Sequence, residues 1–312
     1  MPDGTPAFNQ VVPHGGYLWW YVDALSDDGK HGITIIAFVG SVFSPYYLWA
    51  NRKTMADPDH YCCLNVAIYT KGQKRWTMTE RGPRFSSRDA TTFQIGPSDL
   101  RWTGSALEIN IRERAVPFGQ KVMGQVRVYP EQLFNYSTPL DQAEKHRWGP
   151  IAPTARVEVN LQAPNIQWQG QAYLDSNEGD EPINRSFYEW DWARALLKDG
   201  STGVIYDVRE KNGVEKLLAL QFKSNGQIDT FPLGERQKLP KTLWQINRHL
   251  RSDQEHVKVI EDLEDTPFYS RSVLQGHWMG EEVTCMHETL NVERFSSTIV
   301  QMMLPWRMPR LS

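Results

Sequence analysis

The chain has 312 residues, a formal net charge of -3 and a sequence pI near 6.3. Proteins that bind DNA or RNA carry a basic field, so these values argue against a nucleic-acid partner. The length allows two domains or one large β domain. With 12 Trp, 12 Tyr and 12 Phe, the apolar residues are unusually aromatic, which suits a large core or a pocket for a long apolar or cationic ligand.

The cysteines and the N-terminal residues indicate where the protein works. Cys62, Cys63 and Cys285 cannot form a disulfide framework, which predicts reduced thiols and a cytoplasmic location. Residues 1–16 have neither the basic region nor the apolar core of a signal peptide. Residues 33–50 form an uncharged, membrane-like stretch that glycine, serine and proline interrupt. This stretch predicts a buried strand and then a turn, with an aromatic end at 45–49 suited to touch a membrane surface.

Strands are predicted from the start of the chain. Residues 16–22 and 31–43 form a hairpin around a Ser-Asp-Asp-Gly turn. Segments 107–112, 126–128 and 156–161 alternate apolar and polar residues, the pattern of antiparallel strands with one buried face. Further strands are predicted at 62–69, 75–79, 203–208, 217–222, 256–260, 268–274, 282–291 and 297–304. Residues 187–197 fit either a capped helix or a strand, and their alternating aromatic side chains favour the strand.

These elements predict an all-β fold. No helical pattern of 10–15 residues alternates with the strands, which argues against a parallel α/β sheet. Many short antiparallel strands are typical of barrels and sandwiches, and a closed barrel can enclose a ligand. We expect two antiparallel β-barrel or sandwich domains, at residues 1–152 and 153–312.

Residues 146–182 hold the candidate acid–base chemistry, with the aromatic rings of Trp148, Trp168 and Tyr173 close in sequence. A carboxyl held among rings is desolvated, which would raise the pKa of Asp175 and keep an acid ready to donate a proton. The alternative interpretation is a turn aspartate. His146 shares a strand face with Trp148 and can move a proton near neutral pH, although a histidine between Lys145 and Arg147 is often a surface residue.

Other common sites are not indicated. A calcium loop at Asp175 fails because Ser186 stands where the bidentate Glu belongs. Cys285, His287 and His277 do not make a closed set of ligand spacings, so no metal is predicted. The nucleophile elbow, the P-loop and the dinucleotide fingerprint are missing, which argues against the common hydrolase, nucleotide and dinucleotide classes.

Several long blocks extend over nearly the whole chain: GGYLWWYVDALSDDGKHGITIIAFVGSVFSPYY, HYCCLNVAIY, RWTMTERG, IGPSDLRW, HRWGPIAPTARVEV, YLDSNEGDEP and HETLNVERF. In these blocks the chain resembles the carotenoid 1,2-hydratase (hydroxyneurosporene synthase) family. The resemblance implies two lipocalin-like β domains and a hydro-lyase that needs no organic cofactor. Such an enzyme adds water across the terminal C1–C2 double bond of acyclic carotenoids such as neurosporene and lycopene. The family's His-x-Trp and Tyr-x-Asp pairs fall on His146, Trp148, Tyr173 and Asp175.

The resemblance implies a role for each of these residues. Asp175 would protonate C2, the rings of Trp148 and Tyr173 would stabilise the tertiary cation at C1, and water would capture it. His146 would either accept the proton of the water or only orient Asp175. The substrate would be a long apolar carotenoid, reached by peripheral contact with the photosynthetic inner membrane from the cytoplasm.

Two alternatives stay open at this point. One is a lipocalin-like carotenoid or lipid carrier without catalysis, because one fold hosts many functions. The other is a related hydratase or dehydratase acting on another isoprenoid or polyketide alkene. The sequence does not indicate an oligomeric state.

Overall fold

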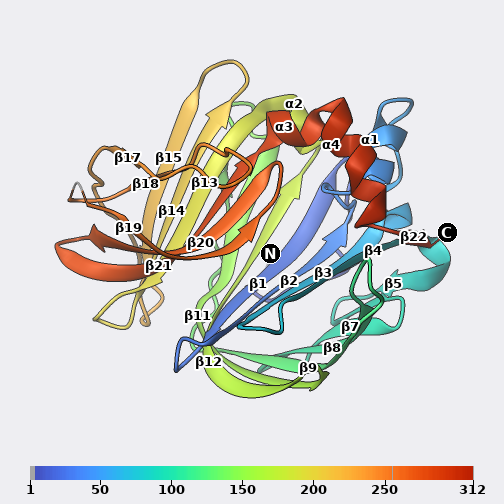
Figure 1. Cartoon of the computed structure of the whole chain (residues 1–312), viewed down its shortest axis with the longest axis horizontal. Helices are drawn as coiled ribbons and strands as arrows, with labels where there is room; N and C mark the ends of the chain where they lie inside the picture. Colours follow the sequence, from blue (N-terminus) through green and yellow to red (C-terminus); the bar gives the residue numbers. More distant parts are fainter. Residues whose placement is uncertain (1–3, 255, 312) are drawn as a thin grey trace. The chain divides into compact units, whose positions relative to one another are not determined.

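The computed structural model describes residues 4–254 and 256–311, which form two compact units (Figure 1). Unit 1 contains the described residues of 1–139, 144–182 and 302–312, and unit 2 contains those of 140–143 and 183–301. Residue 152, where the sequence suggested a domain boundary, lies inside strand β11, His146–Ala163. All of β11 belongs to unit 1.

Unit 1 is built on one sheet, which has 13 strands in the described part of the chain. Its strands are β1 (Tyr17–Ser26), β2 (His31–Val39), β3 (Cys62–Thr70), β4 (Arg75–Arg81), β5 (Ser86–Arg88), β6 (Thr92–Ile95), β7 (Ser98–Trp102), β8 (Leu107–Arg114), β9 (Lys121–Pro130), β10 (Thr138–Pro139), β11, β12 (Asn165–Gly179) and β22 (Arg310–Leu311). The order is β22-β4-β3-β2-β1-β12-β11-β9-β8-β7-β6-β5, and β10 pairs with β11. Short helical segments are α1 (Pro45–Asn51), η1 (Pro58–His60), η2 (Pro83–Phe85) and η3 (Leu304–Trp306).

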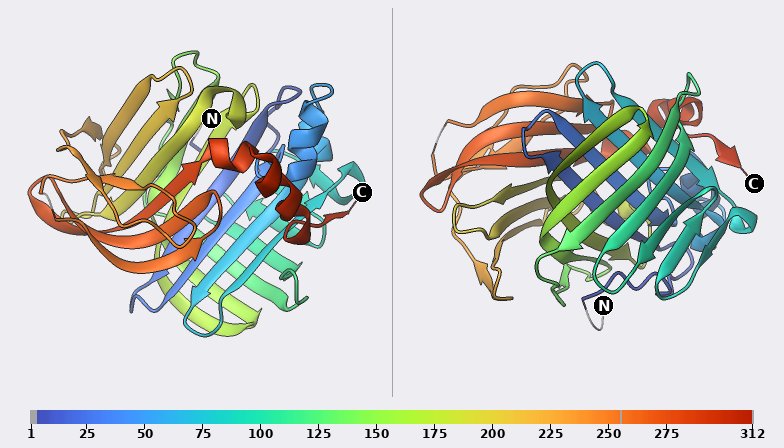
Figure 2. Two further views of the ribbon diagram at one scale, coloured as in Figure 1. Left: turned by 45° about the horizontal axis from the view of Figure 1, so that its top comes forward. Right: turned by 90° about the horizontal axis from the view of Figure 1, so that it is seen from below.

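The sheet of unit 1 curls back on itself, so that green strands cross blue strands in the right-hand view of Figure 2. The curled sheet encloses an apolar core to which its strands from β3 to β6 in the sheet order contribute. This core includes Leu18, Trp20, Val22, Leu64, Ile109, Val126, Val157 and Leu174. Alternation along the strands explains the arrangement, because every second side chain points to the same face.

Unit 2 has a seven-stranded antiparallel sheet in the order β16-β15-β14-β13-β21-β20-β19, beside the two-stranded β17-β18. Its strands are β13 (Phe187–Leu196), β14 (Thr202–Glu210), β15 (Glu215–Phe222), β16 (Ile228–Thr230), β17 (Arg236–Lys238), β18 (His249–Arg251), β19 (Lys258–Asp265), β20 (Tyr269–Trp278) and β21 (Glu281–Asn291). The helices α2 (Ile183–Ser186) and α3 (Val292–Ser296) also belong to unit 2, and the chain passes from unit 2 to unit 1 within α4 (Thr298–Met303).

The predicted all-β class is confirmed, and the strand pairs are antiparallel except for β22 with β4. The ambiguous segment 187–197 forms a strand, β13. Two local predictions are wrong. Residues 45–51 form helix α1 rather than a turn, because Ser44 caps the amides of Tyr46 and Tyr47 and Pro45 occupies the first turn.

In the segment 297–304, predicted as a strand, Thr298–Met303 form helix α4 and Leu304 begins η3. Val300 and Leu304 are buried four residues apart, whereas Ile299 and Met302 are exposed, which is a helical rather than a strand period. The aromatic end at 45–49 is largely packed, since Tyr47 and Leu48 are buried. Within 4–254 and 256–311, no helix has the length and apolarity to span a membrane.

Candidate active site

The predicted site residues lie on the face of the unit 1 sheet that points away from its apolar core. Leu18, Trp20 and Val22 of β1 belong to the core, so the residues that alternate with them point to the opposite face. By the same alternation Tyr173 and Asp175 of β12 point away from Ala172 and Leu174. We call this surface of β1, β12 and β11 the site face.

The strand registers arrange the site face in rows. Gly179 lies opposite Tyr17 and His146, Asn177 opposite Trp19 and Trp148, Asp175 opposite Tyr21 and Pro150, and Tyr173 opposite Asp23. All four predicted residues therefore lie on neighbouring strands of one surface. His146, Trp148, Tyr173 and Asp175 are each at most 3% exposed. The alternative of a turn aspartate does not fit Asp175, because this residue lies within strand β12.

Asp175 is held by two hydrogen bonds to the same oxygen atom. The indole Nε1–H of Trp148 donates to Oδ2 at 2.7 Å, and the hydroxyl of Tyr173 donates to Oδ2 at 2.8 Å. The Tyr21 ring packs edge-on against the Tyr173 ring, with centroids 6.2 Å apart. The carboxyl group is thus fixed in orientation among aromatic rings.

His146 is positioned by a contact that crosses β12. The Tyr17 hydroxyl and His146 Nδ1 are 2.9 Å apart, and the two rings are stacked with centroids at 5.7 Å. This contact depends on Gly179 between them, because a Cβ there would lie 2.3 Å from Tyr17 Cε1 and 2.7 Å from His146 Nδ1. On its other side, His146 Nε2 is 4.0 Å from Glu181 Oε1.

The registers also separate His146 from Asp175. His146 is opposite Gly179, and Asp175 lies four residues before Gly179 on the same strand. Four residues of a strand span about 13 Å, so the two backbone positions are far apart for groups that act on one double bond. Trp148 and Asn177 occupy the row between them.

Sequence reasoning grouped Trp168 with these rings, but the structure places it elsewhere. Trp168 packs against the apolar core of unit 1, on the other face of β12 from Asp175. Sequence reasoning also missed Tyr17 and Asp23, which lie about 150 residues away from Tyr173 in the chain. One signal was present, because Asp23 is a single carboxylate in the apolar run Val22-Asp23-Ala24.

The histidine and cysteine of β21 serve the interior of unit 2. Burial raises the pKa of the Cys285 thiol to about 12, which keeps it protonated, and burial lowers the pKa of His287. His287 Nε2 lies 2.8 Å from the carbonyl oxygen of His249 and 3.6 Å from Asp191 Oδ1. Among the described residues, no group of three or more His, Cys, Asp or Glu side chains is arranged to hold a metal ion.

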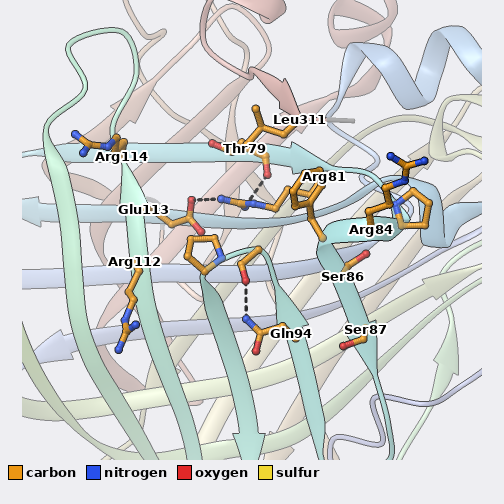
Figure 3. A pocket seen from close by; sticks show the side chains of 14 residues that line it. Thr79, Arg81, Arg84, Ser86, Ser87, Gln94, Arg112, Glu113, Arg114 and Leu311 are labelled. Carbon is orange, nitrogen blue, oxygen red and sulfur yellow. Dashed lines mark hydrogen bonds and ion pairs between the residues drawn. The ribbon is translucent and has the colours of Figure 1, made fainter.

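Unit 1 also has a pocket of about 780 Å³ away from these residues, at the ends of β4 and β8 (Figure 3). Arg81, Arg84, Arg112 and Arg114 line it. Its one carboxylate, Glu113, accepts from Arg81 and from Ser98, each at 2.7 Å. Since Glu113 is ion-paired and the other charges are positive, this lining suits an anion rather than the protonation of an alkene.

Comparison with known proteins identifies the family. Residues 35–312 match the family model of the carotenoid hydratase CrtC. The chain belongs to the carotenoid hydratase family. It is 53% identical over 310 residues to the acyclic carotenoid 1,2-hydratase of Rubrivivax gelatinosus, with 98% of this chain and 76% of that protein covered. It is 49% identical over 312 residues to the acyclic carotenoid 1,2-hydratase of Thiocapsa roseopersicina, with 99% and 77% covered.

The fold of the present chain resembles that of a solved structure of an AttH protein from Nitrosomonas europaea. The TM-score is 0.63 with 15% sequence identity, and the match covers 92% of this chain and 97% of the other. At this identity the likeness concerns the fold alone. It agrees with the predicted lipocalin-like β architecture.

Proposed function

We propose that this protein is a carotenoid 1,2-hydratase, a hydro-lyase that adds water to the terminal C1–C2 double bond of an acyclic carotenoid. Sequence identities of 53% and 49% to two proteins named acyclic carotenoid 1,2-hydratase support the activity. The single structural observation that carries the proposal is the buried Asp175 carboxyl, held by Trp148 and Tyr173 on one face of β12. A carotenoid carrier has no need of a buried acid fixed in this way.

Asp175 acts as the acid in this proposal. Burial among rings disfavours the charged carboxylate relative to the neutral acid. Because Oδ2 accepts two hydrogen bonds, the proton of the neutral acid belongs on Oδ1, which then donates it to C2 of the alkene. As the carboxylate forms, both hydrogen bonds to Oδ2 become charge-assisted and strengthen, so they stabilise the transition state more than the ground state.

The tertiary cation that forms at C1 needs an environment that stabilises positive charge without capturing it. The rings of Trp148 and Tyr173 are our candidates, as the sequence predicts, and Tyr21 on the neighbouring strand adds a third ring to the same surface. A desolvated cation over an aromatic face gains about 2 kcal/mol. The addition of water involves no redox change, so the chain's own side chains suffice for this mechanism.

His146 has two possible roles in the predicted scheme, and the register favours one of them. A base must reach the water that attacks C1. His146 of β11 is opposite Gly179, which is about 13 Å along β12 from Asp175. Its contact with Tyr17 instead suits a positioning role, in which it holds the aromatic end of the site face.

The test of this function is turnover of lycopene or neurosporene in detergent micelles by the purified protein and by Asp175→Asn. We expect the wild-type protein to form a tertiary alcohol, and the variant, folded by circular dichroism, to lose at least about a hundredfold in rate. Near-normal activity of the variant would exclude Asp175 as the acid. Binding of pigment by the wild-type protein without any alcohol would favour the carrier.

We also propose peripheral contact with a membrane, because a carotenoid substrate is carried in lipid. Met302 and Trp306 are 68% and 80% exposed, Met303 is 44% exposed, and the guanidinium of Arg307 lies 4.9 Å from the Trp76 ring. An exposed tryptophan beside an arginine is typical of the membrane interface. The predicted cytoplasmic location stays a prediction.

Co-sedimentation with vesicles of phosphatidylcholine and phosphatidylglycerol tests this contact. Trp306→Ser should weaken vesicle binding about tenfold, because burying one large apolar side chain contributes at least about 1.5 kcal/mol. Leu243→Ser changes another apolar residue that is 93% exposed; it is the matched control and should bind as the wild-type protein does. Equal binding by all three proteins would contradict the proposed contact.

A further inference from the structure

A second buried carboxyl group lies on the site face close to Asp175. Asp23 is 0% exposed and is directly opposite Tyr173, whose hydroxyl donates to Asp175. Asp175 is two residues further along β12, so Asp23 and Asp175 are diagonal neighbours on one face of an antiparallel pair. Residues related in this way have Cα atoms about 7–8 Å apart, roughly half the separation between His146 and Asp175.

A buried hydroxyl lies on the other side of Asp23. Thr34 of β2 is directly opposite Asp23 and is 2% exposed. It points to the site face, because Ile33 and Ile35 on either side of it belong to the core. Within the described part of the chain, Thr34 Oγ1 has no hydrogen-bond partner. A buried hydroxyl without a hydrogen-bond partner destabilises the folded protein by about 1–3 kcal/mol. A ligand of the site that forms a hydrogen bond with Thr34 would remove this cost.

The hydration reaction needs a water molecule held next to the acid, and it needs a base for that water. Carboxyl pairs in which one is the acid and the other activates water are about 6.5–9.5 Å apart in other enzymes, because the water must fit between them. The Cα separation of diagonal positions on one sheet face, about 7–8 Å, is of the same size. We propose that Asp23 and Thr34 hold the water that attacks C1, and that Asp23 is the catalytic base.

These groups account for every proton that moves in the reaction. The resting site holds one proton for the two carboxyls, since two negative charges this close in a buried site oppose each other. The π pair of the alkene takes the proton of Asp175 and forms the C2–H bond, which leaves the cation at C1. A lone pair of the water oxygen forms the C1–O bond, and one O–H bond breaks as Asp23 accepts the proton. The proton then passes from Asp23 back to Asp175, which restores the resting site.

The inference rests on the proposed hydratase function, and one experiment separates the two. Wild-type protein, Asp23→Asn and Thr34→Val are each incubated with lycopene in deuterated water, and both the alcohol and the recovered lycopene are analysed by mass spectrometry. In Asp23→Asn the acid is intact, so the cation still forms, but it returns to the alkene instead of capturing water. In a fraction of these returns the cation loses the original hydrogen of C2 or a hydrogen of a methyl group on C1, and so keeps the deuterium that it received. We expect the alcohol to fall about a hundredfold while deuterium enters the recovered hydrocarbon.

Thr34→Val keeps the side-chain shape and removes only the hydroxyl. We expect it to fold normally and to lose about tenfold in alcohol, the effect of one hydrogen bond to the reacting water, while exchange into lycopene continues. If Asp23→Asn does not fold, Thr34→Val tests the proposed water site by itself. Alcohol formation by Thr34→Val at the wild-type rate would then overturn that site.

Two results with folded Asp23→Asn would overturn the base assignment. One is alcohol formation at nearly the wild-type rate. The other is a parallel loss of alcohol and of exchange, which would mean that Asp23 only supports the acid. No alcohol from the wild-type protein would instead contradict the hydratase function itself.

Discussion

Gly179→Ala tests whether the contact between Tyr17 and His146 holds the site face in place. Gly179 lies between these two residues and leaves room for their contact because it has no side chain. The new Cβ would lie 2.3 Å from Tyr17 Cε1 and 2.7 Å from His146 Nδ1, so at least one ring must move. Overpacking of a buried site costs about 1–3 kcal/mol, and loss of the Tyr17–His146 hydrogen bond costs about 1 kcal/mol more. Alanine in a strand regains about 0.5–1 kcal/mol over glycine. The net loss of unfolding free energy is therefore roughly 1–3 kcal/mol.

The chain contains a matched control in Gly276 of β20. Like Gly179, it is a strand glycine without a positive φ, but an added Cβ there meets Leu250 Cδ2 at 3.4 Å and Ser252 Oγ at 3.8 Å, which are ordinary contacts. Gly276→Ala should be neutral or slightly stabilising in urea denaturation, and hydration of lycopene should be unchanged. Gly179→Ala should lose both stability and activity. If the two variants were equally stable and equally active, the contact across Gly179 would not hold the site.

Two further predictions concern hydrogen bonds and pH. Trp148→Phe and Tyr173→Phe keep a ring but remove one donor to Asp175 Oδ2, so each should lower kcat about 10- to 100-fold with KM little changed. A raised KM at unchanged kcat would show that the rings only line the pocket. Burial raises the pKa of Glu80 from 4.5 to about 7, despite its contact with Arg310, so folding takes up a proton and stability falls as pH rises from about 5 to 8. Glu80→Gln lacks this titration, so its unfolding free energy relative to that of the wild-type protein should rise by about 2–3 kcal/mol from about pH 5 to 8 in urea denaturation. A difference in unfolding free energy that does not change with pH would refute the titration of Glu80.

The alternation of apolar and polar residues made most of the strands predictable. Strand β8 shows why, since Leu107, Ile109 and Ile111 are buried and the residues between them are more exposed. Strand β1 is buried on both faces, so its sequence does not reveal which side chains face the core and which face the site. That division decides that Trp20 belongs to the core and Asp23 to the site face. The division of the chain at residue 152 into two folding domains stays a prediction.

The site was predictable only in part, for a physical reason. The His-x-Trp and Tyr-x-Asp pairs are local, so their spacing alone indicates a shared strand face. The contacts that define their chemistry are not local, because Tyr17 reaches His146 and Asp23 lies opposite Tyr173 only through the pairing of β1 with β12. Register depends on the whole sheet, and no short stretch of sequence specifies it. The separation of His146 from Asp175 follows from the same registers.

The most direct test of the central claim is the position of the label when the wild-type protein hydrates lycopene in deuterated water. If Asp175 protonates C2, the alcohol must carry one deuterium on carbon that does not wash out, and folded Asp175→Asn must give neither alcohol nor label. A hydroxylated product without deuterium on carbon would contradict alkene protonation, and with it the role of Asp175 as the acid.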